Sequence, residues 1–452
     1  MKKFLAILFS ALFVLSFAAS AFAIHAEIPA ETQATVAKGS TQITLGGEIR
    51  TRGWWIANSG TADVANAAWL DERVRLSIDA NVAPGVTGYV QIETRSETDG
   101  DKYTWGNGAK AVNMPVGGRL SDSVAGNAKP DTQLDILQAW ILYTGQGLLG
   151  IPAGLKVGHM PLQLGFGNFF NNTQYGDDAI VFFMDPMKEM HVGLLSVKLG
   201  EGFTSKNGDD TEAYVALATY KLDAKNTIGI NFTYANNSDL RLKLQNLGLH
   251  AGGDISGLGY KIEGDFQFGS VDPTHVSKIK FSGAAASLAL NYKIDPINLR
   301  LAAAMGSGDG DATDNKYKEF IAFTGNTQNY SFIYEYLLKT TAQGGLNPAA
   351  PSDGHAAGFA NTTMLNLGFD YNATKEIGLG LDGYMFRATK TSVPNGSKNA
   401  GWEVDAKMTY AVAKNLNYQI DAGYFNAGKY YDTVAAKAKD VKALRHVLTL
   451  SF

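Results

Sequence analysis

The sequence predicts an all-β fold, a transmembrane antiparallel β-barrel of about 18 strands with 16 as the alternative, short periplasmic turns and long extracellular loops. Three observations predict it. A secretory signal sequence opens the chain, period-two alternation fills most of the remainder, and the last segment alternates up to an aromatic residue. Alternation gives the two faces of a strand different surroundings, as in a barrel wall with lipid outside and water inside.

The first 23 residues have the three parts of a signal peptide. Lys2 and Lys3 form a basic start, an apolar core follows, and Ala21-Phe22-Ala23 matches a small-residue cleavage site. The apolar run is short for a membrane helix. We therefore expect a cleaved signal peptide at 1–23, a periplasmic lead-in at 24–40, one barrel domain at 41–452, and a location in the outer membrane of a Gram-negative cell.

The early strands show the alternation most clearly. In 43–55, Ile43, Leu45 and Ile49 share one face, while the other face carries charged side chains. The stretch 70–80 repeats this pattern, and no segment of the chain offers a second layer that could bury the apolar faces. A strand at 153–166 and a hairpin at 177–200 are also expected, and 16 strands would result if that hairpin were absent.

The turns and loops differ between the two ends of the expected barrel. Short turns that follow a tyrosine recur, for example after Tyr220, Tyr371 and Tyr410, and tyrosine suits a membrane interface. Long connections rich in glycine, asparagine and aspartate lie at 99–130, 306–360 and 428–439. Short turns on one side and long loops on the other are typical of outer-membrane barrels.

The last expected strand carries Phe452, Leu450 and Leu448 on one face. It should pair with the first strand, because an open sheet edge in lipid would leave backbone groups unpaired. Alternating apolar residues before a terminal phenylalanine resemble the signal that the bacterial barrel-assembly machinery reads. The alternative is the edge strand of a secreted β-sandwich.

The faces opposite the apolar ones carry the candidate pore-lining residues. They are Arg50, Arg52, Arg73, Arg75, Arg95 and Arg445, with Glu48, Asp71 and Glu93 interleaved among them. Arginine is always charged and binds carboxylates through a planar fork, so this lining would favour anions in a pore. The alternative is a structural ladder in which each arginine pairs with a neighbouring acid and stiffens the wall.

Composition argues against several other functions. The chain has no cysteine, which excludes a disulfide framework and a thiolate metal site. A net charge of −4 is atypical of nucleic-acid binding. The sequence also shows no zinc-protease motif and no glycine-rich phosphate loop. We therefore expect no cofactor, no metal site, no nucleic-acid partner and no enzymatic activity. Asp309–Asn315 has several oxygens at the spacing of a calcium-binding loop but lacks the usual downstream glutamate. The alternatives are a calcium site and a plain acidic outer loop.

Four features of the sequence carry a family resemblance. The early strand Ile43–Arg52, the stretch Gly154–Gly167, the signal peptide and the terminal phenylalanine together resemble Gram-negative outer-membrane porins, closest to alginate-export-type porins. The resemblance implies an 18-stranded barrel. Gly158-His159-Met160 stands where such porins often have Gly-Arg-Gln, which leaves the substrate open. The connection 167–176 is short for the infolded loop of general porins, so 99–130 or 306–360 is expected to narrow the pore.

The function expected from these observations is an outer-membrane porin, a passive diffusion channel for small hydrophilic solutes, with an anion preference left open. The alternatives are a substrate-specific channel for acidic sugars or polysaccharide, and a surface adhesin or structural barrel. A hydrolase built on His446 with Ser282 or Ser451 is the weakest alternative. Expected partners are outer-membrane lipid and lipopolysaccharide, the barrel-assembly machinery, and small hydrophilic or anionic solutes. The protein is expected to be a monomer or a homotrimer.

Overall fold

The structure is a computed structural model of the chain. It describes residues 34–38, 41–58, 66–95, 103–104, 111–113, 119–121, 133–202, 209–272, 277–311, 313–322, 331–339, 358–391, 396–432 and 437–452. The predicted signal peptide and most of the lead-in therefore lie outside the described residues.

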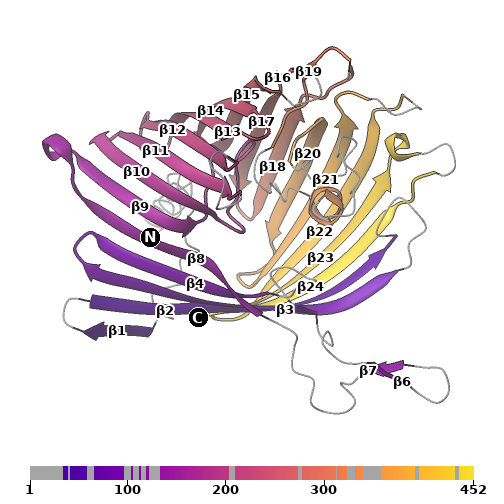
Figure 1. Cartoon of the computed structure of the whole chain (residues 1–452). Coiled ribbons are helices and arrows are strands. Elements are labelled where there is room, and N and C mark those ends of the chain that lie inside the picture. Colours follow the sequence, from indigo (N-terminus) through magenta and orange to yellow (C-terminus); the bar gives the residue numbers. More distant parts are fainter. Residues whose placement is uncertain are drawn as a thin grey trace.

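In this part of the chain, 18 strands form one closed antiparallel barrel. Figure 1 shows them following one another around the ring in sequence order, with the yellow C-terminal strand beside the indigo first strand. The barrel strands are β2 (Thr41–Ala57), β3 (Ala67–Ala83), β4 (Val86–Arg95), β8 (Gln133–Gln146), β9 (Pro152–Met160), β10 (Asp177–Met187), β11 (Met190–Gly200), β12 (Thr211–Lys221), β13 (Thr227–Asn237), β14 (Leu242–Ile255), β15 (Leu258–Val271), β17 (Ala284–Ile294), β18 (Ile297–Gly306), β20 (Thr362–Asn372), β21 (Ile377–Ala388), β22 (Asn399–Ala413), β23 (Leu416–Ala427) and β24 (Val441–Ser451). The predicted fold class is confirmed, the hairpin at 177–200 is present, and the alternative of 16 strands is wrong.

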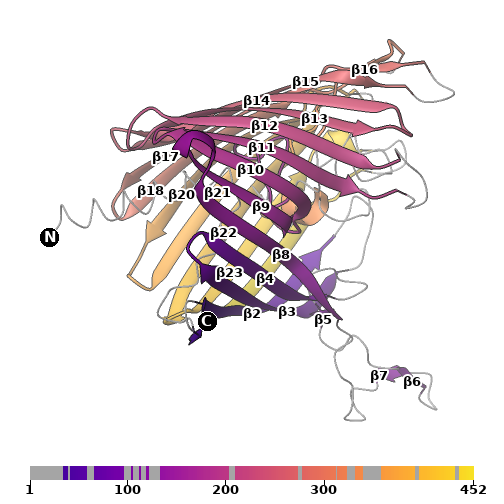
Figure 2. The same cartoon turned by 60° about the vertical axis from the view of Figure 1, so that its left-hand side comes forward.

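The remaining elements are short. They are the strands β1 (Ala34–Lys38), β5 (Tyr103–Thr104), β6 (Ala111–Asn113), β7 (Arg119–Ser121), β16 (Ile279–Phe281) and β19 (Lys316–Tyr317), the turns η3 (Leu148–Gly150) and η5 (Lys429–Tyr431), and the π-helix η4 (Phe332–Lys339). β1 lies in the segment expected to be a periplasmic lead-in and pairs with the start of β2. Figure 2 shows the hairpin β6–β7 standing well away from the barrel wall. No helix of the described residues is long and apolar enough to cross a membrane.

The two faces of the wall differ as the alternation predicted. Leu45, Leu76 and Leu448 point outward with 44%, 45% and 42% of their surface exposed. On the inward face, Arg52 and Asp71 are 4% and 0% exposed. Apolar side chains left uncovered on the outside suit a hydrocarbon solvent, and charged side chains need water or partners on the inside.

The barrel closes between β24 and β2. Gly47 N–H donates to the Phe452 carbonyl at 2.7 Å, and Phe452 N–H donates to the Gly47 carbonyl at 3.0 Å. The Phe452 ring lies over Gly47, where an added Cβ would come within 2.6 Å of it, and the His446 ring covers Gly53 in the same way at 2.0 Å. Glycine is needed at both positions because an aromatic ring occupies the space of a side chain.

Within the described residues, two segments fold into the barrel instead of continuing its wall. The first, here called the inner segment, runs from 161 to 176 between β9 and β10. Its residues Leu162, Leu164, Phe169 and Phe170 are at most 3% exposed and pack against the inward apolar side chains of β10–β17. β9 therefore ends at Met160, and the predicted strand at 153–166 is six residues too long.

The second segment that folds inward is η4, here called the inner helix, from the long connection 306–360. Both views place its orange coil within the ring of strands (Figures 1 and 2). Tyr334 stacks on Phe386 of β21 with ring centroids 4.0 Å apart, and Ile333 is 0% exposed. The expectation that 306–360 enters the pore is therefore confirmed for these residues. The expectation that the connection 167–176 stays out of the pore is wrong. The connection 99–130 lies largely outside the described residues.

Candidate functional site: the charged wall of the lumen

The inward faces of β24, β2, β3 and β4 carry the arginines that the sequence singled out. The strands are neighbours, with Glu48 across from Arg75, Arg50 from Arg73, and Arg52 from Asp71. Arg75 lies across from Glu93 on β4. We call these residues, with Arg445 on β24, the arginine sector.

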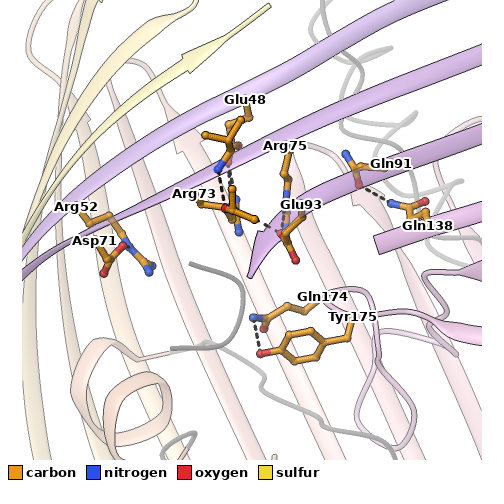
Figure 3. A network of polar contacts seen from close by, with 12 residues as sticks. Glu48, Arg52, Asp71, Arg73, Arg75, Gln91, Glu93, Gln138, Gln174 and Tyr175 are labelled. Atoms are coloured by element: carbon orange, nitrogen blue, oxygen red, sulfur yellow. Dashed lines mark hydrogen bonds and ion pairs between the residues drawn. The ribbon is translucent and has the colours of Figure 1, made fainter. Parts of the chain in front are cut away.

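Ion pairs link the middle of the arginine sector (Figure 3). Arg73 Nη2 lies 2.6 Å from Glu48 Oε1, and Arg75 Nε lies 2.6 Å from Glu93 Oε2. Arg73 also approaches Glu93 at 4.0 Å. Because Glu48 and Arg75 keep 28% and 21% of their side chains exposed, this part of the sector faces the open lumen.

Asp71 is the centre of a buried polar cluster. Its carboxylate accepts hydrogen bonds from Arg52 Nε at 2.7 Å, Trp54 Nε1 at 2.9 Å and Trp69 Nε1 at 3.3 Å. Arg52 also donates to the Tyr336 hydroxyl of the inner helix at 3.1 Å. A buried charge is tolerated only when it is paired and hydrogen-bonded, and Asp71 provides this for Arg52.

Arg445 is enclosed by aromatic rings. Its guanidinium lies 2.7 Å from Asp421 of β23. Its Cζ is 5.0 to 5.4 Å from the ring centroids of Phe332, Trp54 and Tyr336. The inner helix therefore covers Arg52 and Arg445, while Arg73 and Arg75 remain beside the open part of the lumen.

Two arginines complete the predicted set. Arg50 lies on β2 directly across from Arg73, so two like charges face each other in the ladder. Arg95 is the last residue of β4, where its backbone pairs with Gln133. The structure does not describe its side chain. The predicted assembly residues Leu448, Leu450 and Phe452 all point outward from β24.

The charged wall continues toward β8 and β9 through residues that the sequence analysis missed. Gln138 Nε2 donates to Gln91 Oε1 at 3.0 Å, and Lys156 Nζ lies 3.8 Å from the centroid of the Trp140 ring. Figure 3 also labels Gln174 and Tyr175 of the inner segment, where Gln174 Nε2 donates to the Tyr175 hydroxyl at 3.0 Å. The sequence does offer one signal for this part of the wall, because Trp140 is a large aromatic residue at an inward position of a strand whose inward face is otherwise polar.

The acidic loop 309–315 holds its carboxylates in local contacts. Asp311 accepts hydrogen bonds from the Thr313 hydroxyl and amide, which lower the pKa of its carboxyl. A hydrogen bond from the Lys318 ammonium lowers the pKa of Asp314. Within the described residues, no group of three or more histidine or acidic side chains could hold a metal ion.

Comparison with solved structures shows the same barrel fold. OpdK of Pseudomonas aeruginosa, crystallised with vanillate, has a TM-score of 0.57 at 10% identity, over 90% of this chain and 98% of that one. OccK2 (OpdF) of the same organism, in complex with glucuronate, has a TM-score of 0.54 at 10% identity, with the same coverage. At this identity the likeness concerns the fold. No curated protein sequence matches the chain significantly.

Sequence comparison identifies the family of the chain. The model of the family described as alginate export matches residues 207–443, which is more than half of the protein. The family and the barrel fold are those of channels rather than of enzymes, and they support a location in the outer membrane. The chain belongs to the alginate export family of Gram-negative outer-membrane porins.

Proposed function

We propose that the protein is a passive channel for small hydrophilic solutes with a modest preference for anions. The observation that carries this proposal is the arginine sector on the lumen face of a closed barrel. Fields inside a narrow pore with low-dielectric walls are focused, so a small excess of arginine acts strongly on passing ions. Arg50 lies across from Arg73, so two arginines face each other in the ladder, which supports such an excess.

A second candidate is a substrate-specific channel for acidic sugars. The alginate export match and the glucuronate bound to OccK2 favour it, because both involve carboxylated sugars. Vanillate bound to OpdK is also a carboxylate. In this proposal the arginine fork of Arg75, partly open to the lumen, would meet the solute carboxylate.

The ion selectivity of the purified protein in a planar bilayer tests the channel. We expect stable, ohmic conductance and a zero-current potential in a salt gradient that indicates anion preference. Arg75→Gln should shift this potential toward cations, and Glu48→Gln, on the facing strand, should shift it toward anions. Both shifts should shrink near 1 M salt, where the Debye length is about 3 Å.

The outcomes separate the alternatives. Absence of conductance would favour an adhesin or structural barrel. Conductance with an unchanged zero-current potential in both variants would mean that the arginine sector is a structural ladder only. Block of the ion current by glucuronate at low concentration, lost in Arg75→Gln, would favour the substrate-specific channel.

We further propose that Phe452 serves barrel assembly, together with Leu450 and Leu448, after export with a cleaved signal peptide. The outward row of these three side chains supports this proposal. Phe452→Ala should lower the amount of heat-modifiable barrel in the outer membrane, because it removes both the terminal aromatic and its contact with Gly47. Leu365→Ala, an outward residue of β20 far from the seam, is the control. Equal yields of the two variants would contradict the proposal.

A further inference from the structure

The first backbone amides of the inner helix donate hydrogen bonds to two acidic side chains of the barrel wall. Glu403 of β22, 0% exposed, accepts hydrogen bonds from Ile333 N–H at 2.6 Å and Tyr334 N–H at 2.7 Å. Asp405, two residues along the same strand, accepts one from Phe332 N–H at 2.9 Å. The first amides of a helix lack partners within it and carry partial positive charge, so carboxylates satisfy them well.

The inner segment has a similar attachment on a different part of the wall. Glu263 of β15, 2% exposed, accepts a hydrogen bond from Phe166 N–H at 2.7 Å. Asp265, again two residues along, is 1% exposed and accepts a hydrogen bond from Asn246 Nδ2 at 2.8 Å. A glutamate and an aspartate separated by one residue thus stand on the inward face of both strands.

A role in the barrel wall alone does not explain why these carboxyl groups are buried. A buried carboxylate is costly unless it receives hydrogen bonds, and burying one brings no apolar gain. Both glutamates are fully covered by the segment that they hold, and both accept hydrogen bonds from the backbone of that segment. Each such hydrogen bond satisfies a backbone amide that would otherwise be buried without an acceptor.

We propose that the two Glu-x-Asp pairs, Glu263/Asp265 and Glu403/Asp405, are the positioning residues that set the width of the pore. Each pair fixes an inward-folded segment against the wall and so keeps the lumen beside the arginine sector open to a constant diameter. This inference rests on the proposed channel function. Apolar packing, such as Tyr334 on Phe386, keeps each segment inside the barrel, and the carboxylates determine where it stops.

The test compares single-channel conductance and solute size cut-off in the full-length protein. In Glu403→Gln an amide N–H₂ group replaces one of the two oxygens that face Ile333 and Tyr334, so one backbone amide loses its acceptor. Glu263 accepts hydrogen bonds from the backbone amides of Phe166 and Asn168, so Glu263→Gln and the double variant follow the same logic. We expect fluctuating conductance levels and loss of the wild-type size cut-off in liposome swelling with neutral sugars of increasing size, most severely in the double variant.

Asp370→Asn is the matched control, because it removes a carboxylate from the inward face of β20 that contacts Asn298 and Arg300 and neither inner segment. It should change ion selectivity and leave the sugar cut-off unchanged. Heat-modifiable migration on gels verifies that each barrel is folded. If Glu403→Gln fails to fold, Glu403→Asp, which keeps the carboxyl group but withdraws it by one methylene, replaces it with the same expectation.

Three results are distinguishable. Loss of the cut-off in the folded glutamate variants, with an unchanged cut-off in Asp370→Asn, supports the inference. A wild-type cut-off and steady conductance in the folded double variant overturn it while the channel function stands. A wild-type protein that does not conduct would overturn the channel function itself.

Discussion

Asp71→Asn is expected to lower the free energy of unfolding by about 3–5 kcal/mol, the usual cost of breaking a buried ion pair by removing one partner. Asp71 is 0% exposed, and its carboxylate accepts hydrogen bonds from Arg52, Trp54 and Trp69. Asparagine cannot accept from all three, and it leaves the Arg52 charge buried without its counter-charge. Urea unfolding of the refolded barrel in lipid, followed by tryptophan fluorescence, measures the change.

Asp370→Asn gives the comparison in the same lumen. The Asp370 and Arg300 side chains are 44% and 32% exposed, and Arg300 keeps Asp382 at 2.9 Å as a second partner. Water screens such a pair, so the expected loss is at most about 1 kcal/mol. Equal destabilisation by the two substitutions would contradict the view that Asp71 holds a desolvated charge.

Leu76→Arg is expected to destabilise the barrel by about 2–4 kcal/mol, since it points a charge into hydrocarbon near the middle of a spanning strand. Leu76 is 45% exposed on the outward face of β3, between Gly47 and Ile92 of the neighbouring strands. The same unfolding assay in lipid vesicles measures the loss.

Gln91→Arg supplies the inward counterpart at a similar height, because Gln91 pairs with Ser77, the residue after Leu76. An arginine there reaches water in the lumen, so a change well below that of Leu76→Arg is expected. If Gln91→Arg were the more harmful variant, the assignment of inside and outside on β3 and β4 would be reversed.

The wall of the barrel could be predicted from the sequence because lipid and water act on alternate residues of every strand. For this reason the alternation predicts Leu45 outward and Arg52 and Asp71 inward, as they lie in the structure. The pairing of the arginine sector followed from the same phase, since closure makes β24 a neighbour of β2.

The inner segments could not be predicted in this way. Leu162 and Leu164 continue the period of two, so the alternation predicts that they extend the preceding strand. Gly165 and Gly167, however, adopt positive φ values of 55° and 91° and turn the chain inward. The inner helix is mostly apolar although it includes Glu335, and its Ile333 and Tyr334 side chains are packed within the barrel. Neither the alternation of Leu162 and Leu164 nor the apolar character of the inner helix shows whether a segment lies in the lumen or in the barrel wall. The hydrogen bonds from the backbone of these segments to Glu263 and Glu403 cannot be predicted from the sequence.

The seam between β24 and β2 differs from the other ladders in chain topology. The other barrel ladders of the described residues join strands that follow one another along the chain, whereas the seam brings Glu48 opposite Ser451. Neighbouring barrel strands close loops no longer than the connection between β18 and β20, whereas the seam closes nearly the whole polypeptide at once, with an entropic cost that grows as the logarithm of the loop length. Until it forms, the sheet is a ribbon with two unpaired edges, and such edges pair readily with other chains. Weakening the contact of Phe452 with Gly47 should therefore produce strand exchange between molecules and edge-to-edge aggregation before it produces a looser barrel.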